Sequence, residues 1–154
     1  MSEGFIQESG CNVNDMNSID TDDTLFQILN ASTALKAELT GGIYVMGERP
    51  DGSEKEDIVI NNLFINHTIP QTGTSNVNIH VPDMMITIGG KQQYKAKRER
   101  IRTLTELTLS ALKAANVEGL TIRITNETII KEQSIPEHYN NIRIDWNIQK
   151  VTTT

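Results

Sequence analysis

The sequence is poor in residues that fix the shape of many small proteins: it has one cysteine, one tryptophan and only 5% aromatic residues. The single cysteine, Cys11, excludes a disulfide within the chain and fits a reducing compartment. No apolar run approaches the ~20 residues of a membrane-spanning helix, and the first residues lack the basic and apolar parts of a secretory signal. We therefore expect a soluble protein made in a cytoplasm, with no membrane partner.

Motifs for common enzyme chemistry are also missing. The sequence has no GxSxG nucleophile elbow, no P-loop and no GxGxxG fingerprint. The histidines His67, His80 and His138 lie far apart and share no HxxxH or HxH spacing, so no zinc site is predicted. His80 alternates with Asn78 on the polar side of a predicted strand, where we expect it to be solvated. We expect a protein that is not an enzyme and needs no cofactor.

The chain does have an uneven distribution of charge. Residues 1–90 hold three basic against thirteen acidic residues, a net charge near −10. Residues 91–154 hold eleven basic against seven acidic residues, a net charge of about +4. Six of the fourteen lysines and arginines lie within residues 91–102 (KQQYKAKRERIR). Such a division favours contact with a charged partner, either nucleic acid or copies of the same chain.

Alternation of apolar and polar residues predicts the strands. It is free of errors in three segments, which indicates one buried and one solvated face and hence a mostly antiparallel sheet. The strands that we expect are residues 43–46, 58–66, 77–81, 120–125, 128–133 and 142–148. The second of these changes phase midway, which predicts a β-bulge at Asn61-Asn62.

Two helical regions complete the predicted fold. A long helix ends near Ala115, and its apolar stripe is formed by Ile101, Leu104, Leu107, Thr108, Ala111, Leu112 and Ala115. A short N-terminal helix starts at Thr21-Asp22-Asp23, breaks near Ser32 and ends at Gly41-Gly42. The prediction is an α+β fold, an antiparallel (mostly) β-sheet covered on one face by the long helix and the short N-terminal helix. We expect residues 1–20 to form a flexible arm, residues 21–150 a single α+β domain and residues 151–154 a C-terminal tail.

The basic segment 91–102 is the main candidate site. At helical spacing, one face of it spans roughly 17 Å, enough to touch several phosphates, and this face carries Lys91, Lys95, Arg98 and Arg102. Lys97 and Arg100 interrupt the apolar stripe, so the first turns either project past the sheet or are not helical. Three interpretations stay open: a solvated helix end, a contact with an acidic protein, and a nucleic-acid site.

An acidic loop is the second candidate. Its carboxylates are Glu48, Asp51, Glu54, Glu56 and Asp57. Arg49 and Lys55 are interleaved with them, and no apolar residues stand nearby to shift a pKa. We expect a flexible, solvated loop or an interaction surface, with an ion site as the alternative.

The order of elements resembles that of the tail-terminator and tail-completion proteins of tailed bacteriophages, including the neck-ring proteins. Three pieces carry the likeness. The first is the helical region 22–39 that runs through Gly41-Gly42 into Ile43-Tyr44-Val45, and the second is the helix 101–115 followed directly by the strand 117–125. The third is the closing unit, made of residues 129–133, the proline-containing link 134–139 and the strand 142–148.

The resemblance implies a structural virion protein, assembled in the host cytoplasm, that forms a six- or twelve-fold ring in the neck or tail. Such a ring joins the head connector to the tail or terminates the tail, so other portal, connector and tail proteins are the expected partners. DNA passes through its channel without specific binding.

A ring of this kind needs a heterologous interface. The acidic loop 48–57 would lie on one side of a subunit and residues 91–102 on the other, so that the two pair around the ring, or the loop would line the channel. Phe5 and Ile6 would anchor the arm to a neighbour, and the edge strand 128–133 would be covered. The alternative function is a nucleic-acid-binding accessory protein that uses residues 91–102.

Overall fold

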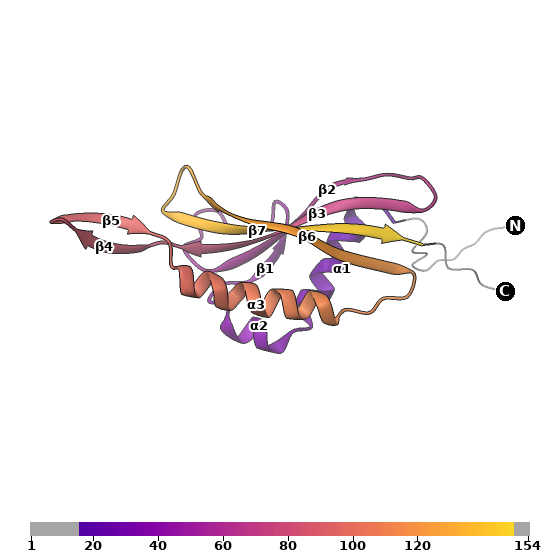
Figure 1. The fold of residues 1–154 in the computed structure, drawn as a ribbon, viewed down its shortest axis with the longest axis horizontal. Coiled ribbons are helices and arrows are strands. Elements are labelled where there is room, and N and C mark those ends of the chain that lie inside the picture. The colour runs from indigo at the N-terminus through magenta and orange to yellow at the C-terminus, as the bar shows by residue number, and fades with distance from the viewer. Residues whose placement is uncertain (1–15, 150–154) are drawn as a thin grey trace, which may run out of the picture.

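The computed structural model describes residues 16–149 and has the expected α+β fold, with a mostly antiparallel sheet (Figure 1). The sheet has five strands in the order β1-β2-β3-β7-β6, and only β1 and β2 run parallel to each other. Their bounds are β1 Ile43–Val45, β2 Asp57–Ile65, β3 Gln71–Pro82, β6 Leu120–Lys131 and β7 Glu137–Ile148. The three alternating segments of the sequence lie on β3, β7 and β6, which pair in antiparallel fashion as predicted.

The helices α1 (Ser18–Asn30), α2 (Thr33–Glu38) and α3 (Arg98–Ala114) all lie on one face of the sheet (Figure 1). The core forms between them, where the predicted stripe of α3 meets the apolar positions of the central strands. Leu25, Leu104 and Ile144 are fully buried there, as is Trp146, whose Nε1 donates to Ser75 Oγ at 2.8 Å. None of the helices within residues 16–149 is long and apolar enough to cross a membrane.

The start of the chain departs from the prediction. α1 begins at Ser18 and not near Thr21, because Asn17 and Asp20 form a capping box in which each side chain accepts from the other's backbone N–H at 2.9 Å. Met16 is buried in the core, so the expected arm 1–20 is ordered from residue 16 onward. The predicted arm contacts Phe5 and Ile6, like the tail 151–154, lie outside the described residues. The predicted break is confirmed, with Ser32 capping α2.

Two strands contain register shifts. The predicted bulge in β2 is confirmed, because the pairing with β3 shifts between Asn62 and Phe64. The pairing of β6 with β7 shifts between Ile124 and Asn126. The two strands expected at 120–125 and 128–133 are both part of β6, which is one long strand. β6 is also the last strand of the sheet order, and its outer edge has no strand beside it within the described residues.

A hairpin that the sequence analysis did not predict extends beyond the sheet (Figure 1). It consists of β4 (Met84–Ile88) and β5 (Lys91–Lys95), joined by Gly89 and Gly90, both with positive φ. Two successive residues with positive φ form the two-residue turn that suits the twist of a hairpin. The prediction of one helical face from Lys91 to Arg102 is therefore wrong for its first half. Residues 91–95 are extended, and the segment is helical only from Arg98.

Candidate functional site

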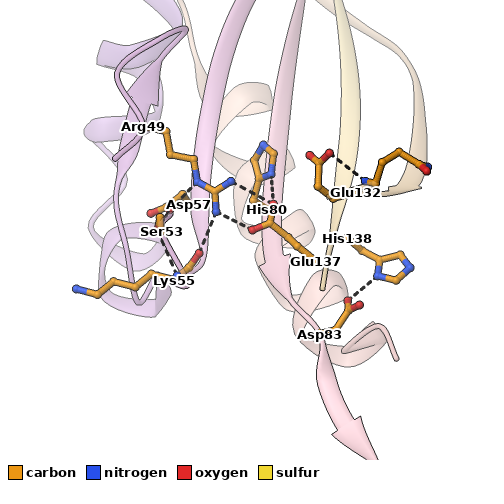
Figure 2. A network of polar contacts seen from close by, with 10 residues as sticks. Arg49, Ser53, Lys55, Asp57, His80, Asp83, Glu132, Glu137 and His138 are labelled. Atoms are coloured by element: carbon orange, nitrogen blue, oxygen red, sulfur yellow. Dashed lines mark hydrogen bonds and ion pairs between the residues drawn. The ribbon is translucent and has the colours of Figure 1, made fainter. Parts of the chain in front are cut away.

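Arg49 is the centre of an ion network at the end of the sheet from which the hairpin projects (Figure 2). Its Nε donates to Asp57 Oδ2 at 2.9 Å, and its terminal nitrogens donate to the two oxygens of Glu137 at 3.1 and 2.7 Å. Asp57 and Glu137 are each only 1% exposed. One guanidinium therefore neutralises two carboxylates that water barely reaches.

The loop between β1 and β2 is held in place through Asp57. The backbone N–H of Gly42 donates to Asp57 Oδ1 at 2.9 Å, and the hydroxyl of Ser53 donates to Oδ2 at 2.6 Å. Gly41 allows this approach, because a Cβ on it would lie 1.9 Å from Asp57 Oδ1. The carboxylate thus ties the loop, β1 and β2 together.

Glu137 also binds His80, whose Nδ1 lies 2.8 Å from Glu137 Oε2. The His80 ring stacks on Tyr139, with ring centroids 4.9 Å apart. His80 is 9% exposed, so the expectation that it is solvated is wrong. Its strand face is the polar one, as predicted, but the Arg49 loop and the end of β7 cover this position.

The pKa of Glu137 reflects these contacts. Burial alone would raise it, but the hydrogen bonds from His80 and Arg49, together with their charges, lower the pKa to about 2. The ionised carboxylate is therefore the form that stabilises the fold. Its contribution is complete above the ordinary pKa of about 4.5 and is lost as the pH falls from there toward 2.

We predict that the free energy of unfolding of the wild-type chain falls between pH 4.5 and pH 2 by about 2–3 kcal/mol more than that of Glu137→Gln. The amide does not titrate, so the variant lacks this part of the pH dependence. Urea unfolding at pH 7, 5, 4, 3 and 2 measures the difference. Parallel curves for the two chains would show that Glu137 is not held ionised by the network.

A second ion network fixes the residue at which the hairpin leaves the sheet. Asp83 lies between β3 and β4, and its side chain is fully buried. Asp83 Oδ1 lies 2.6 Å from His138 Nδ1, and Oδ2 lies 3.8 Å from Lys131 Nζ. The Asp83 backbone N–H donates to the carbonyl of Pro136 at 2.9 Å. The base of the hairpin is therefore attached to the start of β7 through His138 (Figure 2).

A third network connects the predicted basic and acidic segments within one subunit. Arg100 donates to both oxygens of Glu56 at 2.6 and 2.9 Å and to Glu38 Oε1 at 2.6 Å. Hydrogen bonds with Glu56 and Glu38 raise the pKa of Arg100 further above its ordinary value. Thr40 Oγ1 accepts from the Glu56 backbone N–H at 2.9 Å. Arg100 thus occupies an apolar position of α3 because its side chain forms ion pairs with Glu56 and Glu38 of the same subunit.

The acidic loop differs from the expectation in two ways. Glu56 and Asp57 are buried in ion pairs and are not part of a flexible loop, whereas Glu48, Asp51 and Glu54 are exposed as expected. The loop also lies at the same end of the subunit as the basic segment, because Arg49 contacts the start of β7 and Glu56 contacts α3. The idea that the acidic loop and the basic segment occupy opposite sides of a subunit is therefore wrong.

The predicted basic residues divide between two elements. Lys91 and Lys95 lie on β5 and share one face of the hairpin, whereas Arg98 and Arg102 lie one turn apart on α3. All four are exposed. Arg102 has one weak partner among the described residues, Glu99 at 3.7 Å on the same helix. These four residues form an exposed basic surface at the hairpin end of the molecule.

The hairpin also exposes large apolar side chains on both of its faces. Met84 and Ile88 share a face with the lysines and are 40% and 45% exposed, and Met85 and Tyr94 are paired on the other face, each 51% exposed. The hairpin is thus a projecting element that is both apolar and basic. Sequence analysis missed it, although Gly89-Gly90 between two extended segments was a signal of a tight turn.

One group of side chains has the composition of a cation site. His80, Glu132 and Glu137 place one potential ligand atom each within 4.8 Å of one another. Both oxygens of Glu137, however, already accept hydrogen bonds from Arg49. A cation there would have to displace a guanidinium, so this arrangement favours a structural ion network.

Comparison with known proteins gives no family. No family model and no curated protein matches the sequence. Among solved structures, one protein without a descriptive name aligns with a TM-score of 0.44 at 13% identity, over 85% of this chain and 98% of that chain.

Proposed function

We propose that this chain is a non-enzymatic structural subunit of a phage virion, which forms a ring in the neck or tail that joins the head connector to the tail or terminates the tail. The observation that supports this most is the β4–β5 hairpin, which projects from the sheet and exposes apolar side chains on both faces. Two-stranded hairpins are at best marginally stable alone in water. A partner that covers its apolar side chains would stabilise this hairpin.

The edges of the sheet support a subunit that meets neighbours on more than one side. The outer edge of β6 is twelve residues long, and Ile129 and Ile130 on this strand are 47% and 36% exposed. On the opposite side, β1 pairs only with residues 58–60 of β2. Natural proteins rarely leave edges of this length uncovered, and neighbouring subunits would cover them in a ring.

The three ion networks support the same role. They lie where the hairpin, the loop before β2 and the start of α3 meet, and they join elements distant in sequence, such as Arg49 with Glu137 and Arg100 with Glu56. Paired buried charges of this kind restrain the direction in which neighbouring elements project. A closed ring requires such a restraint, because each subunit must meet the next at the same angle.

Light scattering after size-exclusion chromatography, over a hundredfold range of concentration, tests this proposal. We expect one species of six or twelve copies of the 17.2 kDa chain that persists on dilution. A chain that stays monomeric at every concentration would contradict the proposal.

A nucleic-acid-binding accessory protein is the second candidate, because Lys91, Lys95, Arg98 and Arg102 are all exposed at one end of the molecule. Binding through phosphates weakens linearly in the logarithm of the salt concentration. Titration of duplex DNA at 50 to 300 mM salt distinguishes the candidates. Tight binding at physiological salt with the expected slope would favour the second candidate over the ring.

A further inference from the structure

We propose that the β4–β5 hairpin of one copy docks on the opposite end of a second copy, where α1 and β2 form an acidic and apolar surface. This inference rests on the proposed function, since it names the contact by which the ring would close. We call residues 84–98 the basic end. We call the surface at the other end the acidic patch, and it is formed by Ile19, Asp20, Asp23 and Leu63.

The basic end combines charge of one sign with exposed apolar groups. Residues 84–98 contain four basic and no acidic residues, a net charge of +4. Met84 and Ile88 lie on the same hairpin face as Lys91 and Lys95 and are 40% and 45% exposed. A surface of this kind fits a partner that is apolar and negatively charged.

The acidic patch has the complementary composition. Residues 16–35 hold Asp20, Asp22 and Asp23 and no basic residue, a net charge of −3. Beside them, Ile19 and Leu63 are 66% and 42% exposed.

The patch is one continuous surface, because α1 lies against β2. Asn62 Nδ2 donates to Thr21 Oγ1 at 3.0 Å, and the Gln71 side chain donates to the carbonyl of Met16 at 2.8 Å. One buried oxygen of Asp22 has no hydrogen-bond partner within the described residues. Within residues 16–149, no basic side chain forms an ion pair with Asp20, Asp22 or Asp23.

The two surfaces lie at opposite ends of β3. The hairpin follows Pro82, the last residue of β3, whereas the contact with Met16 is made by Gln71, the first residue. Twelve extended residues separate these ends by about 36 Å, and Figure 1 shows the hairpin and the β2–β3 turn on opposite sides of the molecule. The basic end of one copy can therefore meet only the acidic patch of another. Repetition of this head-to-tail contact gives a ring or an open chain.

Other acidic or uncovered surfaces of the chain fit the basic end less well. Glu48, Asp51 and Glu54 are exposed, but their loop lies beside the basic end of the same subunit and includes the exposed Lys55. The open edge of β6 carries Arg123, Glu127 and Lys131, which give it a net charge of +1. The acidic patch is the surface that matches the basic end in both charge and apolar character.

A complementation experiment tests the contact. We use a hairpin variant, Met84→Ser with Ile88→Ser, and a patch variant, Ile19→Ser with Leu63→Ser, and we check by circular dichroism that both fold. Each alone should lose self-association, with a dissociation constant at least tenfold higher than that of the wild type. Mixed, they should form a 1:1 heterodimer by analytical ultracentrifugation, since one retains an intact basic end and the other an intact acidic patch. The control Val117→Ser, an exposed apolar residue between α3 and β6 and outside both surfaces, should associate like the wild type.

A charge exchange gives a second readout at other positions. Lys95→Glu should weaken self-association at least tenfold, and so should Asp23→Lys. A chain with both changes should recover most of the wild-type affinity, because the two charges then meet with exchanged signs. Recovery would support the contact even if one of the serine variants failed to fold.

The possible outcomes separate this inference from the proposed function. Rings that persist in both serine variants, or that only the Val117→Ser control disrupts, would overturn the docking contact and leave the ring proposal standing. A heterodimer in the mixture together with open chains of the wild type would support the contact and contradict the ring. A wild-type chain that is monomeric at all concentrations would overturn both.

Discussion

Arg49→Ala is expected to lower the free energy of unfolding by about 3–5 kcal/mol at pH 7. The guanidinium is the common partner of Asp57 and Glu137, which are both 1% exposed. Without it, Asp57 keeps hydrogen bonds from Gly42 and Ser53, and Glu137 keeps His80, but no permanent positive charge remains beside either carboxylate. Buried charges that lose their partner cost several kcal/mol, much more than an exposed ion pair.

Urea denaturation of the wild type and the variant at pH 7 measures this loss. Arg49→Lys should recover only part of it, since an ammonium cannot donate to both carboxylates in the forked geometry of a guanidinium. Lys55→Ala is the matched control, because Lys55 is an exposed cation on the same loop, and its replacement should change stability by less than about 0.5 kcal/mol. A loss below 1 kcal/mol for Arg49→Ala would show that the network does not hold this end of the fold.

Arg98→Glu combined with Arg102→Glu is expected to abolish assembly and leave the fold intact. Both side chains are exposed and lie on α3 directly after the hairpin. The weak pair between Arg102 and Glu99, at 3.7 Å, contributes little at such exposure. The double change alters the net charge of the basic surface by −4, so this surface would repel an acidic partner.

Light scattering and circular dichroism on the same samples measure assembly and folding separately. Lys113→Glu with Arg143→Glu is the matched control, since it makes the same change of charge at exposed positions outside the basic surface. That control should assemble like the wild type. If the Arg98/Arg102 variant also assembles normally, the basic surface is only solvated and takes no part in a subunit contact.

The strands and the long helix could be predicted because their pattern is local. Alternation in the central strands and the apolar stripe from Ile101 each report burial on one face, and a single sequence contains that information in full. The phase change at Asn61-Asn62 predicted the bulge for the same reason. The fold class followed from these segments, because a sheet with one polar face needs helices on the other face only.

The ion networks could not be predicted, because their members are distant in sequence. Arg49 and Glu137 are 88 residues apart, and Arg100 and Glu56 are 44 residues apart. A charged residue in a loop looks solvated until its partner is known, so Glu56 and Asp57 were expected to be flexible. The sequence did mark Arg100 as unusual, because it occupies an apolar position of α3, but the pattern alone could not show that a buried carboxylate lies opposite.

The hairpin was missed because residues 91–95 fit two patterns. Lys91 and Lys95 share a face at helical spacing, and they also share a face in a strand, where every second residue points the same way. The positive φ of Gly89 and Gly90 decides between the two, because it turns the chain back along β4. The basic surface consists of the predicted residues, but they lie on a hairpin and on the start of a helix and not on one helical face.

Native mass spectrometry of the wild-type chain tests the central claim, a closed ring of identical subunits, most directly. We expect one assembly with a fixed number of copies, six or twelve, which loses subunits only when activated in the gas phase. A ladder of all stoichiometries would indicate an open chain. A spectrum that contains only the monomer, under conditions that preserve weak complexes, would contradict the claim.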